Sequence, residues 1–207
     1  MQSNFQVLIN TPGQIASLVS SIIVMFCTFI TFIAVLIDFS EFQERKETKK
    51  EKKSIVETGT MILFFFLFYA LIRLGVGRFI AMFPALKISL EAIGSLILLI
   101  GCFVNVRGRF NLGKNWSNQI KIYKDHNFIS TGMYKFVRHP LYASIIWMFF
   151  GASIIYTNYA AFFANIIVFF PFMYYRAKQE EEMLLREFKE YKKYQTKVGM
   201  FFPKLLK

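Results

Sequence analysis

Long apolar runs constrain this sequence more than any other feature. The first, residues 15–37, contains 23 consecutive residues interrupted only by Ser and Thr. A helix of that length crosses a hydrocarbon layer about 30 Å thick. Four further apolar runs follow, at residues 58–84, 88–106, 140–156 and 159–175. Because only helices and closed barrels satisfy their backbone hydrogen bonds in lipid, we expect an all-α integral membrane bundle of about five transmembrane helices.

The composition excludes other broad classes. Hydrophobic residues make up 55% of the 207 residues, and 26 of them are Phe. A soluble domain of this size could not bury so much apolar surface and still cover itself with polar groups. Two cysteines are too few for a disulfide-stapled module. We expect one membrane domain, residues 1–207, with N-terminal spans in residues 1–106 and a second half in residues 107–207.

The net charge of +12 is concentrated between the apolar runs. Residues 38–57, 107–139 and 176–207 contain 22 of the 25 Lys and Arg. Such loops are typical of the cytoplasmic side of a membrane, so we expect the N-terminus outside, the basic loops inside, and no nucleic-acid partner. The membrane would be the plasma membrane in a prokaryote and the endoplasmic reticulum in a eukaryote. Residues 38–57 contain good helix formers without Gly or Pro, which predicts a solvated helix between two spans.

Polar and aromatic residues that could bind a ligand are concentrated in a single loop and at the start of the next span. Taken alone, each residue has a plain structural explanation, such as a turn glycine or an interfacial aromatic. Their density in one loop of an otherwise apolar chain favours a ligand site. The candidate residues are Gln119, His126, Asn127, Phe128, Ile129, Tyr134, His139, Pro140, Leu141 and Tyr142.

Three motifs in the C-terminal half resemble a known family. Residues 111–117 are Asn-Leu-Gly-Lys-Asn-Trp-Ser, similar to its Leu-Gly-x-x-Trp-Ser element. Residues 126–142 follow its pattern His-x-Leu-x-x-x-Gly-x-Tyr-x-x-x-Arg-His-Pro-x-Tyr, with Phe128 in place of Leu. Residues 176–203 are similar to its Arg-x-x-x-Glu-Glu tail. The family is that of the isoprenylcysteine carboxyl methyltransferases and their prokaryotic relatives, near the phospholipid methyltransferases.

This resemblance implies an S-adenosylmethionine-dependent methyltransferase acting on a lipophilic small-molecule or prenylated acceptor in membrane lipid. It makes residues 107–207 the catalytic half of the domain. It assigns Arg176 to the substrate and Glu180 to the cofactor, and these two are the candidate catalytic residues. Tyr134, Tyr142, Phe128 and Ile129 could form a slot for the adenine ring. His139, Gln119 and the backbone of residues 126–129 could supply hydrogen bonds, and Glu180 could face the ammonium group.

Arg176 and Glu180 also admit a simpler interpretation. They are four residues apart, so they could form an ordinary ion pair on the surface of a helix. Arg176 comes immediately after an apolar run, however, where a guanidinium could hold a substrate carboxylate with two hydrogen bonds. The next two acidic residues, Glu181 and Glu182, are expected to be solvated. Two His and two Cys in apolar runs indicate no metal site.

Three alternative functions remain. A phospholipid amine could be the methyl acceptor, although the positive charge of Arg176 would repel an ammonium group. A nicotinamide-dependent membrane reductase has a similar C-terminal architecture, but this chain lacks the extra spans that such enzymes usually carry. A non-enzymatic basic scaffold would explain the charge but not the polar cluster. The identity of the acceptor and the oligomeric state stay open at this stage.

Overall fold

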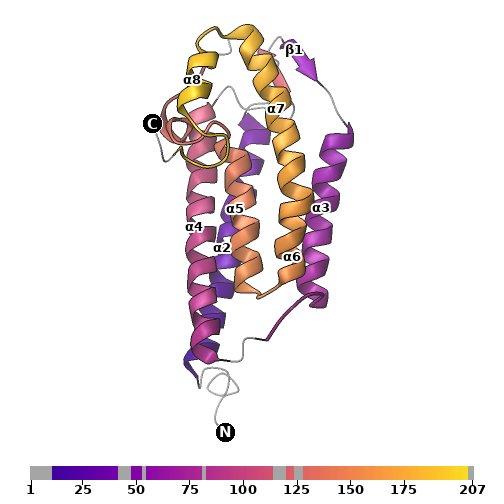
Figure 1. Cartoon of the computed structure of the whole chain (residues 1–207), viewed down its shortest axis with the longest axis vertical. Coiled ribbons are helices and arrows are strands. Elements are labelled where there is room, and N and C mark those ends of the chain that lie inside the picture. Colours follow the sequence, from indigo (N-terminus) through magenta and orange to yellow (C-terminus); the bar gives the residue numbers. More distant parts are fainter. Residues whose placement is uncertain are drawn as a thin grey trace.

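Each of the five apolar runs contributes to a helix in the computed structural model (Figure 1). The structure describes residues 11–41, 48–52, 55–80, 83–113, 120–123 and 128–204. The helices are α2 (Pro12–Glu41), α3 (Ile55–Leu74), α4 (Pro84–Leu112), α5 (Pro140–Ile155), α6 (Tyr159–Ala164), α7 (Phe170–Glu187) and α8 (Tyr191–Lys197). A π-helical turn, η3 (Asn165–Phe169), joins α6 to α7, and a short 3-10 helix, η2 (Gly132–Lys135), precedes α5.

The helices have the dimensions of a membrane protein. Among the described residues, Pro12–Ile37, Pro84–Leu112 and Tyr159–Glu187 are long and apolar enough to cross a bilayer. Two shorter apolar helices, Gly59–Leu74 and Pro140–Ile155, complete the set. The expectation of an all-α integral membrane fold is therefore confirmed.

The solvated helix predicted for residues 38–57 is wrong. Helix α2 ends at Glu41, and the strand β1 (Thr48–Lys52) pairs antiparallel with β2 (Ile120–Tyr123). The intrinsic helix preference of these residues is weak compared with a set of backbone hydrogen bonds to a second strand. This two-stranded sheet ties the first polar loop to the loop that precedes η2.

Two helix boundaries differ from those predicted near residue 84. The second apolar run does not stay helical to residue 84, because α3 ends at Leu74 and the following Gly75 and Gly77 adopt positive φ. Residues 84–87, which separate the second and third apolar runs and for which the sequence predicts a turn, are instead the first turn of α4, where Pro84 occupies a position that needs no backbone N–H. Helix α4 also continues to Leu112, six residues beyond the expected end of the third apolar run.

The C-terminal helix is interrupted earlier than its charge pattern predicted. The charge pattern of residues 176–194, with apolar residues on one side, predicts a single helix from Arg176 to about Tyr194, but α7 ends at Glu187 and Phe188 adopts an extended conformation. Helix α8 starts at Tyr191. The break turns α8 back over the end of the bundle (Figure 1).

Close backbone contact between α4 and α5 holds the centre of the bundle together. A Cβ atom added to Gly94 would lie 2.6 Å from the carbonyl oxygen of Gly151, and one added to Gly151 would lie 2.6 Å from that of Gly94. Helix α2 also packs against α4, where the Ser17 hydroxyl donates to Glu91 at 2.7 Å. Phe64 of α3 stacks on Phe169 with ring centroids 4.5 Å apart.

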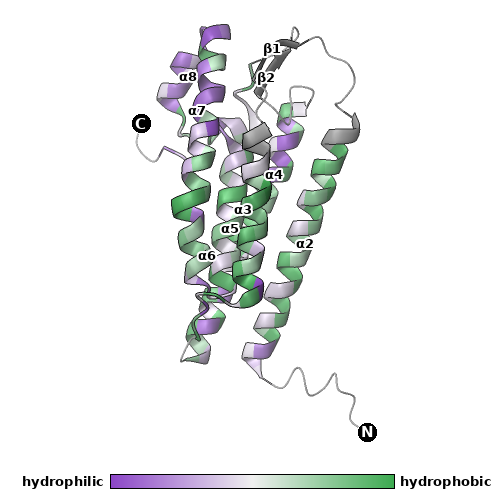
Figure 2. Cartoon of the chain, turned by 90° about the vertical axis from the view of Figure 1, so that its right-hand side faces the viewer, coloured by the Kyte–Doolittle hydropathy of each residue, from purple (hydrophilic) through white to green (hydrophobic). Residues whose placement is uncertain are grey.

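The polar elements gather at one end of the bundle. Figure 2 shows hydrophobic residues along the middle of the helices and hydrophilic ones on α8 and the adjoining part of α7. The backbone N–H of Met133 in η2 donates to the Asn111 side chain at the end of α4, at 2.9 Å. The segment before α5 runs beside the C-terminal segment, since the N–H groups of Arg138 and His139 donate to the carbonyls of Gly199 and Met200. These contacts place the start of α5 next to α7 and α8.

The contact between Gly94 and Gly151 generates a stability prediction. We expect Gly94→Ala and Gly151→Ala each to lower the free energy of unfolding by about 1–3 kcal/mol, because the added methyl group would force α4 and α5 apart. Gly59→Ala in α3 is the matched control, since nothing lies within 4 Å of its added Cβ and alanine favours a helix. Thermal unfolding in detergent would measure all three. Equal effects at Gly94 and Gly59 would contradict this account of the packing.

Candidate active site

The site forms where the start of α5 meets the polar half of α7. His139 immediately precedes α5 and is 5% exposed. Its ring stacks on that of Tyr142, with centroids 5.5 Å apart and planes 9° apart. Its Nδ1 lies 3.5 Å from the Oε2 atom of Glu180 on α7. Three of the predicted residues therefore lie in contact.

Arg176 lies one helical turn before Glu180 and is also buried. Its side chain is 5% exposed, its Nη1 lies 3.3 Å from the Met61 sulfur of α3, and its Cζ lies 5.9 Å from the centre of the Tyr142 ring. The last distance is within the range of a cation–π interaction. Burial on this scale does not fit the simple interpretation of Arg176 as half of an ion pair on a helix surface.

Glu181, which we expected to be solvated, is 1% exposed. Its Oε1 atom accepts from Arg138 Nε at 2.6 Å and lies 3.1 Å from His139 Nε2. Its Oε2 atom accepts from Gln195 Nε2 at 2.7 Å. The expectation was wrong because only the three-dimensional fold brings these partners around the carboxylate. The other half of that expectation was right, since Glu182 is exposed.

Arg138 extends this network to the C-terminal segment. Its Nη1 donates to the backbone carbonyls of Gln195 and Val198, at the end of α8. A cation at a helix C-terminus is favourable because the last carbonyls of a helix lack partners within it. Arg138 and Glu181 together therefore fix α8, α7 and the start of α5 relative to one another.

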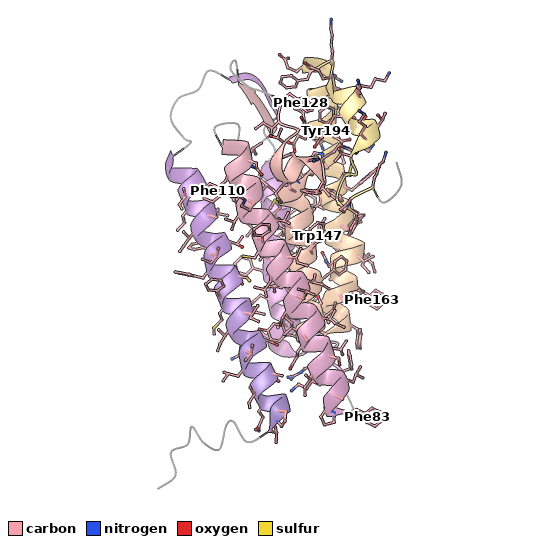
Figure 3. All side chains as sticks on the ribbon, turned by 90° about the vertical axis from the view of Figure 1, so that its left-hand side faces the viewer. Phe83, Phe110, Phe128, Trp147, Phe163 and Tyr194 are labelled. Carbon is pink, nitrogen blue, oxygen red and sulfur yellow. The ribbon has the colours of Figure 1, made fainter. Side chains whose placement is uncertain are left out.

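An aromatic group lies beside this network. The Phe128 ring is 5.7 Å from Tyr191 and 5.2 Å from Tyr194, both edge-on, and 6.0 Å from Phe188. Figure 3 shows Phe128 and Tyr194 together at the polar end, far from Phe83 at the other end of α4. The Tyr194 hydroxyl donates to the Tyr134 carbonyl. Tyr191 is 2% exposed, and its hydroxyl has no hydrogen-bond partner within the described part of the chain.

The electrostatics of the site favour a charged imidazole. Burial alone would lower the pKa of His139, but hydrogen bonds to the carboxylates of Glu180 and Glu181 outweigh burial and raise it. Burial raises the pKa of the Tyr134 phenol well above its usual value, and the charge of Glu180 raises it further. Burial also raises the pKa values of Tyr191 and Tyr194. The tyrosines are therefore neutral hydrogen-bonding groups at ordinary pH.

The structure brings most of the predicted residues together. His139, Tyr142, Arg176 and Glu180 form one cluster. Three others occupy positions around it: Tyr134 is buried in η2, Pro140 begins α5, and the carbonyl of the half-buried Leu141 accepts from Ser144. The half-buried Phe128 and Ile129 lie at the entry to η2. Gln119, His126 and Asn127 lie outside the described residues.

Sequence reasoning did not identify Glu181, Arg138 or Gln195 as parts of the site. One signal for Glu181 was present. Met173, Ala177 and Glu181 recur every four residues and are all buried, so the carboxylate continues the inward-facing stripe of α7. Within the residues described, no group of three or more His, Cys, Asp or Glu could hold a metal ion.

The network around Glu181 leads to a second stability prediction. Glu181→Ala should lower the free energy of unfolding by about 3–5 kcal/mol, because it leaves the buried Arg138 guanidinium without its carboxylate. Glu182→Ala, an identical change at the neighbouring exposed position, should change it by less than about 0.5 kcal/mol. Chemical or thermal unfolding in detergent would compare the two. Similar small effects would show that the network does not hold this end of the bundle together.

The raised pKa of His139 predicts how stability depends on pH. The contribution of the protonated ring is fully present below the ordinary His value of 6.5 and is lost as the pH rises through the higher value of the folded chain. The Tm difference between wild type and His139→Gln should therefore be largest at acidic pH and shrink as the pH rises. Thermal unfolding across about pH 5.5–9 would measure it. A difference that does not change with pH would contradict the assignment.

Comparison with known proteins identifies sequences similar to this chain. The family model described as the isoprenylcysteine carboxyl methyltransferase family matches residues 93–186. The protein-S-isoprenylcysteine O-methyltransferase of Saccharomyces cerevisiae is 31% identical over 133 residues, which cover 59% of this chain and 56% of the relative. That of Tribolium castaneum is 30% identical over 126 residues, covering 58% and 45%. This chain thus spans about half the length of these curated relatives.

A solved structure shares the fold. It is that of the eukaryotic intramembrane Ras methyltransferase, an isoprenylcysteine carboxyl methyltransferase, and it matches with a TM-score of 0.63 at 22% identity. The match covers 95% of this chain and 69% of that one. The comparisons therefore confirm the resemblance to the isoprenylcysteine carboxyl methyltransferase family, and the matched residues 93–186 include His139, Arg176 and Glu180.

Proposed function

We propose that this chain is a membrane-embedded methyltransferase that transfers a methyl group from S-adenosylmethionine to the carboxylate of a lipophilic acceptor of the isoprenylcysteine type. The observation that carries the proposal is the pairing of a buried cation with a nearby carboxylate on one helix. Arg176 follows directly on the apolar part of α7, and Glu180 lies one turn further, beside His139. An acceptor with an apolar tail and an anionic head suits that boundary.

The residues at the polar end of the bundle fit the cofactor. Its adenine ring needs aromatic neighbours, which Phe128 and Tyr194 offer. The buried Tyr191 hydroxyl has no hydrogen-bond partner among the described residues and could bond to the cofactor. Its ammonium group needs a carboxylate, and the Glu180 side chain is 37% exposed while its neighbour Glu181 is engaged by three partners. We therefore assign the cofactor to the surface between α5, α7 and α8.

The chemistry requires positioning more than proton transfer. When bound, the cofactor supplies an electrophilic methyl group. The acceptor carboxylate is already ionised at neutral pH, so no side chain has to act as a base. Arg176 would orient it by two parallel hydrogen bonds, and the rings of Tyr142 and His139 would keep water away from it. His139 would hold Glu180 in place through its Nδ1 atom.

The charge of Arg176 supports a carboxylate acceptor over a lipid amine. A buried guanidinium stabilises an anion and repels an ammonium group. The curated relatives in Saccharomyces cerevisiae and Tribolium castaneum are named protein-S-isoprenylcysteine O-methyltransferases, which agrees with an oxygen acceptor. We infer a prenylated or similarly lipophilic acid that reaches the site from the surrounding lipid.

We further propose that the polar end of the bundle faces the cytoplasm and that residues 1–207 work as one catalytic unit. The polar end carries β1, β2, α8 and the charged half of α7, which belong to the three basic regions 38–57, 107–139 and 176–207. Anionic lipid on the cytoplasmic leaflet would attract these residues.

Substitutions at Arg176 and Glu180 would test the proposed roles. Arg176→Ala should lower kcat/KM for the acceptor by roughly 100-fold or more while leaving cofactor affinity nearly unchanged. Arg176→Lys should restore little, because an ammonium group cannot form the same two-pronged contact. Glu180→Ala should instead weaken cofactor binding by about 10- to 100-fold.

The measurement is transfer of a radiolabelled methyl group from S-adenosylmethionine to a prenylcysteine-like acid and, separately, to a lipid amine. Arg186→Ala, which removes an exposed arginine from the last turn of α7, is the matched control. If Arg176→Ala methylates the acid at the wild-type rate, Arg176 does not bind the acceptor. Methylation of the amine alone would favour the phospholipid alternative.

A further inference from the structure

One buried side chain near the proposed acceptor site has no role in the mechanism above. Gln179 on α7 is 7% exposed, and neither its amide nitrogen nor its amide oxygen has a hydrogen-bond partner among the residues that the structure describes. By contrast, the Gln195 amide donates to Glu181 at 2.7 Å. Gln179 thus keeps both a donor and an acceptor unused in a buried position.

Its position on the helix places Gln179 on the Arg176 side of α7. At about 100° per residue, Gln179 is about 60° around the helix axis from Arg176 and about 160° from Glu181. Glu181 marks the flank that faces Arg138, His139 and α8. Gln179 therefore lies on the opposite flank, next to the guanidinium that we assign to the acceptor.

A buried amide without hydrogen-bond partners destabilises the folded protein, so the presence of Gln179 at this position points to a ligand that supplies those partners. A primary amide that loses water without gaining partners destabilises the fold. A leucine would fill a similar volume without that cost. The complementary ligand group has an N–H and a C=O side by side, as a peptide bond or the edge of a purine does.

We propose that Gln179 determines acceptor specificity by hydrogen bonding to an amide group adjacent to the acceptor's carboxylate. This inference rests on the proposed function and adds to it a specificity-determining residue, the side chain that distinguishes an N-acylated amino acid from a simple thioether acid. Arg176 would hold the carboxylate, and Gln179 would pair with the amide one or two bonds away. A purine edge offers the same chemistry, but the cofactor is assigned to the Glu181 flank of α7.

The test compares two acids that differ only in the amide. One is an N-acetyl-S-prenylcysteine, and the other is the corresponding S-prenyl-mercaptopropionic acid, which lacks the acetylamino group. In the full chain, wild type should have about a tenfold higher kcat/KM for the amide-bearing acid. Gln179→Leu should abolish this preference by raising KM for that acid, with turnover of the other acid and cofactor affinity within about twofold of wild type.

A stability measurement provides a second readout. Because leucine removes an unsatisfied buried amide, Gln179→Leu should raise the Tm of the ligand-free protein by a few degrees. Gln14→Leu is the chemically matched control at an exposed position at the other end of the molecule. It should leave the preference unchanged, and it should not raise the Tm, because it removes the hydrogen bond that Gln14 accepts from the Thr11 N–H.

Each other outcome overturns the assignment in a distinct way. An unchanged preference in Gln179→Leu would show that this side chain does not contact the acceptor amide. An equal loss for both acids with weaker cofactor binding would assign Gln179 to the purine edge. A lowered Tm would show that the amide has partners in the folded chain. If wild type methylates neither acid, the proposed function itself is wrong, and this inference falls with it.

Discussion

The polar end of this protein depends on one buried carboxylate. Glu181 accepts hydrogen bonds from three directions, namely Arg138 before α5, His139 at the start of α5 and Gln195 on α8. A buried charge is tolerated only when it is paired and hydrogen bonded, so these partners have to stay in place for the bundle to fold. The same requirement holds His139 against Glu180 and Tyr142, and the geometry of the site follows from it.

The membrane explains why this network sits at one end. The middle of the bundle is assembled by close contacts of Gly94 with Gly151 and by stacked phenylalanines, which need no polar group. Helix α7 begins in that apolar region and ends in the polar one. Arg176 lies at the transition, and this position allows a charged acceptor head and its apolar tail to be bound at the same time. The proposed chemistry depends on that boundary.

The sequence predicted those parts of the structure that depend on local pattern. Apolar runs long enough to span lipid predicted the helices, and the spacing of His139, Tyr142, Arg176 and Glu180 in recognisable motifs predicted the cluster. Contacts between segments that are distant in the sequence could not be predicted in this way. Nothing in the charged residues 38–57 indicates that part of them pairs with β2, and the solvated appearance of three consecutive glutamates conceals that Glu181 is buried. The role of Gln179 likewise depends on which flank of α7 it occupies.

Binding of S-adenosylhomocysteine, the demethylated form of the cofactor, tests the central claim most directly. Calorimetric titration of the purified full chain in detergent with S-adenosylhomocysteine should give saturable heat with one site per chain, whereas NADPH and anionic lipid should not compete for that site. Glu181→Gln, measured at a temperature where it stays folded, should bind more weakly because His139 and Glu180 would lose their fixed positions. Absence of any heat from S-adenosylhomocysteine at millimolar concentration with folded wild-type protein would contradict the account.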